Sequence, residues 1–307
     1  MKPIQTNKRN EKYDSDPTPQ TIIMASAHNT TPKTKFDPIT LLKAKAPDNN
    51  FAQILLGIVD MLGDVTYTDQ VKLDAVNARM NGDRFSMEEH LKAIVYSLFS
   101  AQKKWKDVLP KLPTIDEIFC NYSIPAIRAK GAERILEEIF AKRCGSRSTQ
   151  QQMGKLEEIL RTLECHHDAL ERDFARLEHY AERIVPWIRT LAVSPRDKFP
   201  MMGPALLALY FQWIGIPIMK IDVHLGRICG STRLGLMPSY SIPEKATNAM
   251  TLRGLEELLG AAREISENPR FFIWVDDVFW SFGERSYCKK QPACSQCSNQ
   301  NYCNYIK

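Results

Sequence analysis

Half of the eight cysteines in this chain lie within its last twenty residues, and this cluster constrains the fold more than any other feature. The thiols follow the spacing C-x5-C-x2-C-x5-C at Cys288, Cys294, Cys297 and Cys303. Pro292 precedes the second cysteine, and short loops with turn residues can bring four thiols together. A secreted disulfide framework would be richer in cysteine throughout, so a local cluster in a chain of 307 residues points to metal. Soft thiolates suit an iron-sulfur cluster or a tetrahedral zinc ion, and spacing alone does not separate these two from four unconnected thiols.

The composition describes an ordinary globular chain. Its hydrophobic content of 44% over 307 residues is enough for one or two cores. It has no run of about eighteen uncharged apolar residues and no apolar leader, so we expect no membrane partner and a place inside the cell, in the cytoplasm, nucleoid or nucleus. The net charge is +5, and residues 1–45 hold eight Lys or Arg against four Asp or Glu. Global charge does not indicate a nucleic-acid partner, so any such affinity must come from local basic patches and backbone amides.

Apolar periodicity predicts an all-α fold. Residues 1–48 are rich in Thr, Pro, Asn and Lys without a sustained period, and we expect a disordered tail there. From Phe51 onwards apolar residues recur at helical spacing, as in Phe51, Ile54, Leu55 and Ile58, and no convincing alternating strand occurs. The charged stretch 154–182 is expected to form solvated helices.

The segment 199–208, with the sequence FPMMGPALLA, predicts a sharp turn into an apolar helix. Pro204 suits the first helical turn, and Gly203 is expected to supply the backbone freedom of the turn. A helix that begins after a tight turn exposes unpaired amides, which can bind a phosphate. Further along, Asp222 precedes another apolar helical repeat and fits an N-cap.

Several segments together resemble one protein family in order and spacing over roughly residues 85–303. The matching segments are Ser100-Ala101-Gln102 at the end of an apolar helix, the Lys-Gly-Ala sequence within 129–135, the turn 199–205, Asp222 with His224 and Arg227, and the aromatic helix 271–280 before the cysteine loop. They resemble the helix-hairpin-helix DNA glycosylase superfamily, in particular endonuclease III and the adenine-mismatch glycosylases. That family more often has one more residue between its first two cysteines.

The resemblance implies a two-domain architecture. A six-helix domain would cover 89–221, with the helix-hairpin-helix near 190–213. A discontinuous iron-sulfur cluster domain would combine 49–88 with 222–307. By resemblance the four cysteines hold a structural [4Fe-4S] cluster, with zinc as the alternative.

The resemblance also implies a DNA repair activity. The family's aspartate matches Asp222, which would assist hydrolysis of the N-glycosidic bond of a damaged or mismatched base flipped from double-stranded DNA. Bifunctional members carry a lysine where this chain has Ala205, so we expect a monofunctional enzyme without Schiff-base lyase activity. We also expect it to be a monomer. A noncatalytic DNA-binding protein on the same scaffold is the alternative. The resemblance does not identify which base is excised.

The expected DNA contacts come from three places. Gln102 matches the residue that fills the gap left by a flipped base. The hairpin would meet phosphate through Met202, Gly203 and Ala205, and the cysteine loop through basic side chains. Met201 stands where the family has its first hairpin glycine, and a Met would be strained there if the position needs a positive φ. The expected loop contacts are Arg285, Lys289 and Lys290.

Overall fold

The computed structural model describes residues 36–63, 69–101, 103, 105–175, 177–241, 243–285 and 287–306. In this part of the chain the regular elements are helices, and the extended pairing is limited to an isolated bridge between Gly230 and Met237. The all-α fold is therefore confirmed for these residues. None of their helices is both long and apolar enough to cross a membrane.

The chain enters its fold earlier than the sequence analysis expects. The helix α1 spans Pro38–Lys45 and is followed by α2 (Asn50–Leu62) and α3 (Gln70–Met80). Asp37 caps α1 by accepting hydrogen bonds from the amides of Ile39 and Thr40, both at 3.1 Å, and Leu42 is fully buried. The expectation of a disordered tail is therefore wrong for residues 36–48, while residues 1–35 lie outside the described residues.

The middle of the chain folds into many short helices because proline and glycine interrupt it repeatedly. Its α-helices are α4 (Met87–Ser100), α5 (Trp105–Val108), α6 (Leu112–Ile118), α7 (Ile124–Lys130), α8 (Ala132–Ala141), α9 (Thr149–Met153), α10 (Leu156–Asp173), α11 (Tyr180–Val193) and α12 (Pro204–Trp213). Two 3-10 turns, Leu109–Lys111 and Cys120–Tyr122, lie between them. The described residues of this region therefore form more helices than the six expected.

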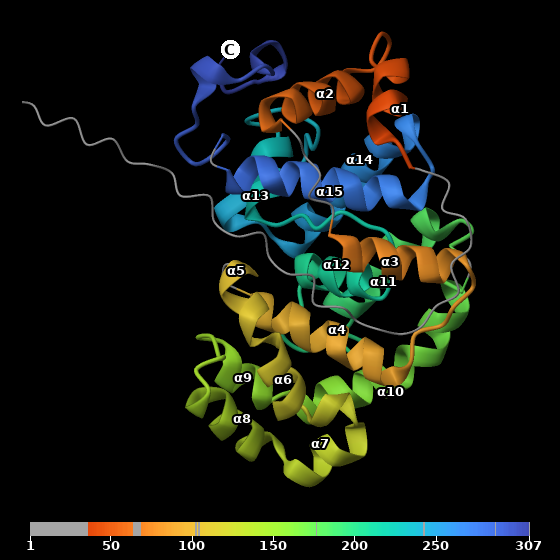
Figure 1. Ribbon diagram of the computed structural model, residues 1–307, viewed down its shortest axis with the longest axis vertical. Coiled ribbons are helices and arrows are strands. Elements are labelled where there is room, and N and C mark those ends of the chain that lie inside the picture. Colours follow the sequence, from red (N-terminus) through yellow and green to blue (C-terminus); the bar gives the residue numbers. More distant parts are fainter. Residues whose placement is uncertain are drawn as a thin grey trace, which may run out of the picture.

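Three further α-helices complete the fold: α13 (Val223–Cys229), α14 (Asn248–Ile265) and α15 (Pro269–Glu284). A short 3-10 turn at Pro243–Lys245 lies between α13 and α14, and two more, Cys294–Gln296 and Gln300–Tyr302, follow α15. Figure 1 shows α1, α2 and the cysteine loop at one end of an elongated molecule, and α6 to α9 at the other. The helices α3, α11 and α12 lie between these two ends.

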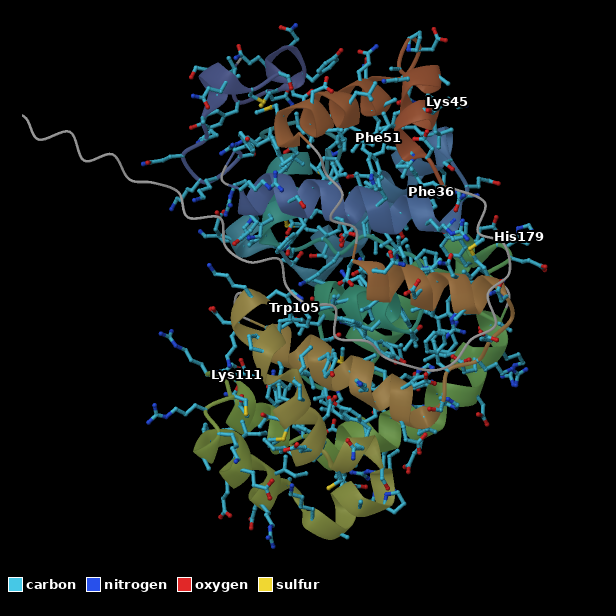
Figure 2. The ribbon with its side chains drawn as sticks, viewed as in Figure 1. Phe36, Lys45, Phe51, Trp105, Lys111 and His179 are labelled. Carbon is cyan, nitrogen blue, oxygen red and sulfur yellow. The ribbon has the colours of Figure 1, made fainter. Side chains whose placement is uncertain are left out.

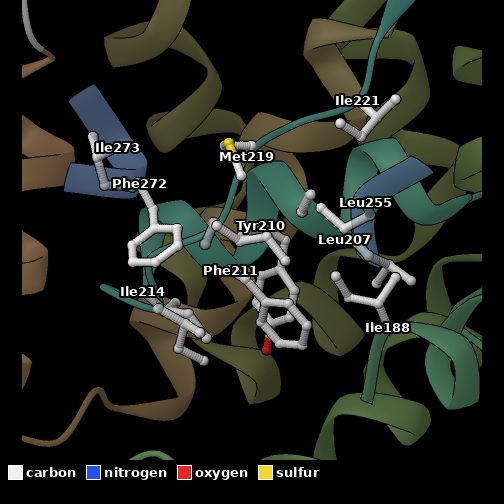
Figure 3. Close-up of a cluster of buried hydrophobic side chains, with 14 of the residues drawn as sticks. Ile188, Leu207, Tyr210, Phe211, Ile214, Met219, Ile221, Leu255, Phe272 and Ile273 are labelled. Atoms are coloured by element: carbon white, nitrogen blue, oxygen red, sulfur yellow. The ribbon is translucent and has the colours of Figure 1, made fainter. Parts of the chain in front are cut away.

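The apolar helix α12 lies at the centre of the core. Its Leu207, Tyr210 and Phe211 are fully buried, and Figure 3 shows them among side chains of α11, α14 and α15, including Ile188 and Phe272. Nearly all buried apolar residues of the described chain form one connected cluster. The helix α12 packs against α3, α4, α11 and α14, and this packing does not by itself divide the chain into the two expected domains.

A buried polar network joins α3 to the middle helices. Glu171 of α10 accepts hydrogen bonds from Arg79 Nη2 and His90 Nε2, both at 2.7 Å, and from the Phe85 amide at 3.0 Å. The Tyr210 hydroxyl lies 2.6 Å from His90 Nδ1. Arg79 and His90 are fully buried and Glu171 is only 3% exposed. The expectation of a solvated helix is therefore wrong for this carboxylate, although most acidic residues of α10 face solvent.

In the turn before α12, the residue with the unusual backbone conformation is not the one that the sequence analysis expects. Gly203 is the N-cap of α12 with an extended backbone, φ −83° and ψ 176°, so its conformational freedom is not used and that expectation is wrong. The positive φ falls on Met201, at 63°. Pro204 occupies the first turn of α12 as predicted. The Met201 side chain is 40% exposed, so little burial offsets the cost of its left-handed backbone.

Replacing Met201 with glycine is therefore expected to stabilise the protein by about 0.5 to 1 kcal/mol, because relief of the left-handed strain exceeds the entropy that glycine adds to the unfolded chain. The neighbouring Met202→Gly change should destabilise by about 2 to 5 kcal/mol, because Met202 is 3% exposed and its removal leaves a cavity. Urea unfolding of both variants measures the two effects. Equal destabilisation by both changes would contradict the strain at position 201.

Candidate functional site

A cavity of about 590 Å³ opens where the first turn of α12, the start of α13 and the side of α15 meet. Gly203, Pro204 and Ala205 line it from the N-terminus of α12, and Asp222 lines it from the N-terminus of α13. The chain brings these residues together because α12 ends at Trp213 and the segment 214–222 runs back along the core to α13.

Asp222 combines a structural contact with a position on the cavity wall. Its Oδ1 accepts hydrogen bonds from the amides of His224 at 2.8 Å and Leu225 at 3.2 Å, which confirms the predicted N-cap. Its Oδ2 lies 3.9 Å from Lys220 Nζ, and its side chain is 19% exposed. The cap uses one carboxylate oxygen, so the second can face a ligand together with the lysine.

Two more carboxyl groups lie at the side formed by α15. Asp276 accepts hydrogen bonds from Gln212 Nε2 at 2.9 Å and from the Lys220 amide at 2.6 Å. Asp277 accepts one from the Asp69 amide at 2.9 Å. Burial raises the pKa of both groups, against the attraction of Lys72, and brings the pKa of Asp277 to about 7. The cavity therefore holds a carboxyl group that can give up a proton near neutral pH.

Aromatic side chains supply the apolar part of the lining. Trp105 and Trp213 pack with ring centroids 5.7 Å apart, and Trp280 and Tyr240 also line the cavity. Burial raises the pKa of Tyr240, and the Asp222 carboxylate raises it further, so this phenol stays neutral beside Asp222. Flat rings with polar groups at their edges suit a planar heteroaromatic ligand.

The expected hairpin contacts divide into two kinds. Gly203 and Ala205 line the cavity, where Ala205 presents no amine. Met202 points into the core, and its amide already donates to the Phe199 carbonyl at 3.3 Å. Gln102 lies outside the described residues, but Ala101 and Lys103 on either side of it line the cavity.

His224 has a packing role that the sequence left open. A Cβ atom on Gly283 of α15 would lie 2.9 Å from His224 Nδ1, so the glycine permits the close approach of α15 to the start of α13. Arg227 faces Glu244, with 3.3 Å between its Nη2 and the carboxylate Oε1. Both residues hold α13 and its cap in place beside the cavity.

The four C-terminal cysteines are free of disulfides, and Cys288 lies close enough to Cys297 and Cys303 for their charges to interact. Burial raises the pKa of Cys288, Arg233 opposes this, and the neighbouring Cys303 and Cys297 raise it again. The Arg233 guanidinium donates to Cys288 Sγ at 3.1 Å and to the Lys289 carbonyl at 3.2 Å. Thiols are ligands that soft metals prefer, but in the described chain no three His, Cys, Asp or Glu side chains are arranged as a metal site.

The three basic residues expected to contact DNA from the cysteine loop are not equivalent. The Lys289 and Lys290 side chains are exposed, and their carbonyls face Arg233. Arg285 instead donates from Nη1 to the Leu62 carbonyl at 2.8 Å, at the end of α2. Arg285 therefore already stabilises the packing of α15 against α2.

Sequence reasoning missed four residues of this region. Tyr240 and Arg233 lie in irregular segments whose neighbours are set only by the tertiary fold. Asp276 and Asp277 carried a readable signal, because two adjacent acids inside the apolar helix 271–282 have no place in a core unless they are bonded or functional.

Comparisons of this chain with protein-family models, with curated proteins and with solved structures find no match. The case for a function therefore depends on the cavity, the hairpin and the cysteine loop themselves.

Proposed function

We propose that this protein is a monofunctional DNA glycosylase that hydrolyses the N-glycosidic bond of a damaged or mismatched base flipped out of duplex DNA. The observation that carries the proposal is that Asp222 and the first turn of α12 line the same cavity. Its volume of about 590 Å³ falls within the range of about 300 to 1,000 Å³ of small-molecule pockets. The cavity would then lie between a cluster domain, 49–88 with 222–307, and a hairpin domain, 89–221.

The residues of the cavity can divide the chemistry between them. The rings of Trp105, Trp213 and Trp280 would enclose the flipped base. Cleavage of the glycosidic bond builds positive charge on the sugar, which the free oxygen of Asp222 would stabilise while it orients the attacking water and takes up the proton that this water loses. Asp277, with its pKa of about 7, can supply the proton that the departing base takes up.

Ala205 supports hydrolysis over lyase chemistry. It occupies the second position of α12 and lines the cavity, where a lysine would place its amine within reach of the sugar. A methyl group cannot form a Schiff base, so water is the nucleophile in this proposal.

The four cysteines would hold a [4Fe-4S] cluster in this proposal, with zinc as the alternative for the same thiols. When bound, the cluster would fix the shape of the loop and supply no step of the base-removal chemistry. Lys289 and Lys290 would then be held toward the DNA backbone.

Arg233 is expected to protect such a cluster, because its charge-assisted hydrogen bond to Cys288 favours the thiolate. We expect Arg233→Gln to lower the iron content and to speed the loss of visible absorbance under air about 10-fold or more. Arg227→Gln serves as the control, because Arg227 faces Glu244 and not a cysteine. Equal cluster lifetimes in the two variants would contradict this role.

A panel of duplexes tests the glycosylase. Each duplex carries one lesion: an oxidised pyrimidine, an alkylated purine, uracil, or a mismatched adenine or thymine. The expected result is release of a free base from at least one duplex, with the strand left intact until alkali is added and with no borohydride-trapped adduct. Absence of base release from every duplex would overturn the proposal, and a trapped adduct would overturn the monofunctional part of it.

A noncatalytic DNA-binding protein is the second candidate. Ala205 and Met201 favour it, because both replace residues that the resembling family uses at the hairpin, and because the N-cap alone accounts for one oxygen of Asp222. Tight binding of lesion duplexes without base release would favour this candidate.

A further inference from the structure

We propose that six basic residues beside the cavity form an additional docking surface for the phosphate backbone of duplex DNA. This basic patch consists of Lys103, Lys106, Lys111, Lys142, Arg143 and Arg147, contributed by the edge of α5, the following 3-10 turn and the loop between α8 and α9. It depends on the proposed function only in taking DNA as the partner.

The patch is strongly positive and open to solvent. Within the segments 103–111 and 141–148, Asp107 is the only acidic residue. Lys106, Lys142, Arg143 and Arg147 are exposed, and Lys103 and Lys111 are half-buried. Such a concentration of one sign of charge attracts a polyanion over a distance of about 10 Å at moderate ionic strength.

Two lysines hold the loop between α8 and α9 against the edge of the cavity. Lys103 Nζ donates to the Cys144 carbonyl and Lys111 Nζ donates to the Arg143 carbonyl, each at 2.7 Å. Burial lowers the pKa of Lys103, and the charge of Lys111 lowers it further. The fold therefore brings like charges together, and an anion bound between them would relieve their repulsion.

The patch continues directly from the cavity, which favours DNA over an acidic protein. Lys103 and Lys106 line the cavity themselves, and Lys103 also contacts the loop. Figure 2 shows Trp105 and Lys111 near each other toward the left of the view, with Lys45 at the upper right. A duplex with one nucleotide in the cavity would extend its backbone past these side chains.

The salt dependence of binding tests the patch. The probe is an undamaged fluorescent duplex, and its affinity is measured by anisotropy at several salt concentrations. The patch variant carries Lys142→Gln, Arg143→Gln and Arg147→Gln. The control carries Lys43→Gln, Lys45→Gln and Arg172→Gln, which remove the same charge from exposed positions on α1 and α10.

We expect the slope of log affinity against log salt to become shallower by about 2 to 3 in the patch variant, because each lost phosphate contact removes about 0.9. Affinity at low salt should fall at least about 10-fold, and the control should stay within about 2-fold of wild type. An unchanged slope in the patch variant would overturn the proposal, and so would an equal loss of DNA affinity in the patch and control variants. Polyglutamate serves as an acidic protein probe. If the patch variant loses binding of polyglutamate and keeps its affinity for DNA, the proposal is also overturned.

The result is separable from that of the lesion panel. If no base is released but the slope changes as expected, the glycosylase fails and the patch stands. If base is released and the slope does not change, the patch fails alone. All three substituted side chains are exposed, and matching thermal unfolding curves for the two variants check that the fold is intact.

Discussion

Replacing Asp222 with asparagine is expected to reduce base release at least about 100-fold while leaving the free energy of unfolding unchanged. The Asn side-chain oxygen can accept the same hydrogen bonds from the His224 and Leu225 amides, and Asn caps helices as well as Asp does. What is lost is the negative charge that the proposed mechanism places beside the sugar, where general base and electrostatic catalysis contribute about 100-fold to 10,000-fold. The pair of measurements thus separates the cap from the chemistry.

Asp222→Ala provides the matched comparison. It removes both the charge and the cap, so it should lose the same activity and, in addition, about 1 kcal/mol of stability. Single-turnover base release and urea unfolding are measured on all three proteins. If Asp222→Asn kept full activity, the Asp222 carboxylate would act only as the cap of α13, and the noncatalytic interpretation would then be preferred.

Local patterns were sufficient to predict the helices and the cap. The apolar spacing that begins at Phe51 became α2, and Asp222 before an apolar repeat became the N-cap of α13. Both depend on neighbours within a few residues, which a sequence displays directly. The same kind of local signal is present at Asp37 and Pro38, a capping residue followed by a first-turn proline, and it marks the start of α1 inside the segment expected to be a disordered tail.

Features set by distant contacts could not be predicted. The resemblance marks Met201 as a position where a positive φ would cause strain, but nothing in the local residue types chooses Met201 over Gly203 for that conformation. The packing of Phe199 and Met202 into the core sets the path of the turn. Glu171 sits in a charged stretch that looks solvated, yet Arg79, ninety-two residues away, draws it into the core. The sequence predicted Asp222 as a site residue, but the positions of Tyr240 and of the two α15 carboxyl groups beside it could be found only from the structure.

Glu171→Gln is expected to destabilise the protein by about 3 to 5 kcal/mol, because it leaves the fully buried Arg79 without its countercharge. Glu164→Gln on the same helix is the control. Glu164 pairs with Arg128 at 2.8 Å on the surface, where such pairs contribute little. Urea unfolding of the three proteins at neutral pH gives the comparison, and equal midpoints for the two variants would contradict the role of the network.

The pH dependence of that difference gives a second measure of the same network. Burial would raise the pKa of Glu171, but the hydrogen bonds from His90 and Arg79 outweigh it and lower the pKa to about 2, below its usual 4.5. A depressed carboxyl pKa stabilises the fold fully above pH 4.5, and this stabilisation is lost as the pH falls toward 2. The gap between wild type and Glu171→Gln should therefore be widest above pH 4.5 and shrink by up to about 1.4 kcal/mol per pH unit below it. Burial also lowers the pKa of His90 below its usual 6.5, so wild-type stability begins to fall below that pH as well.

The difference in unfolding free energy between wild type and Glu171→Gln is measured by urea unfolding from pH 7 to 3. A difference that stays constant over this range would show that the loss in Glu171→Gln comes from packing and not from the ionised carboxylate.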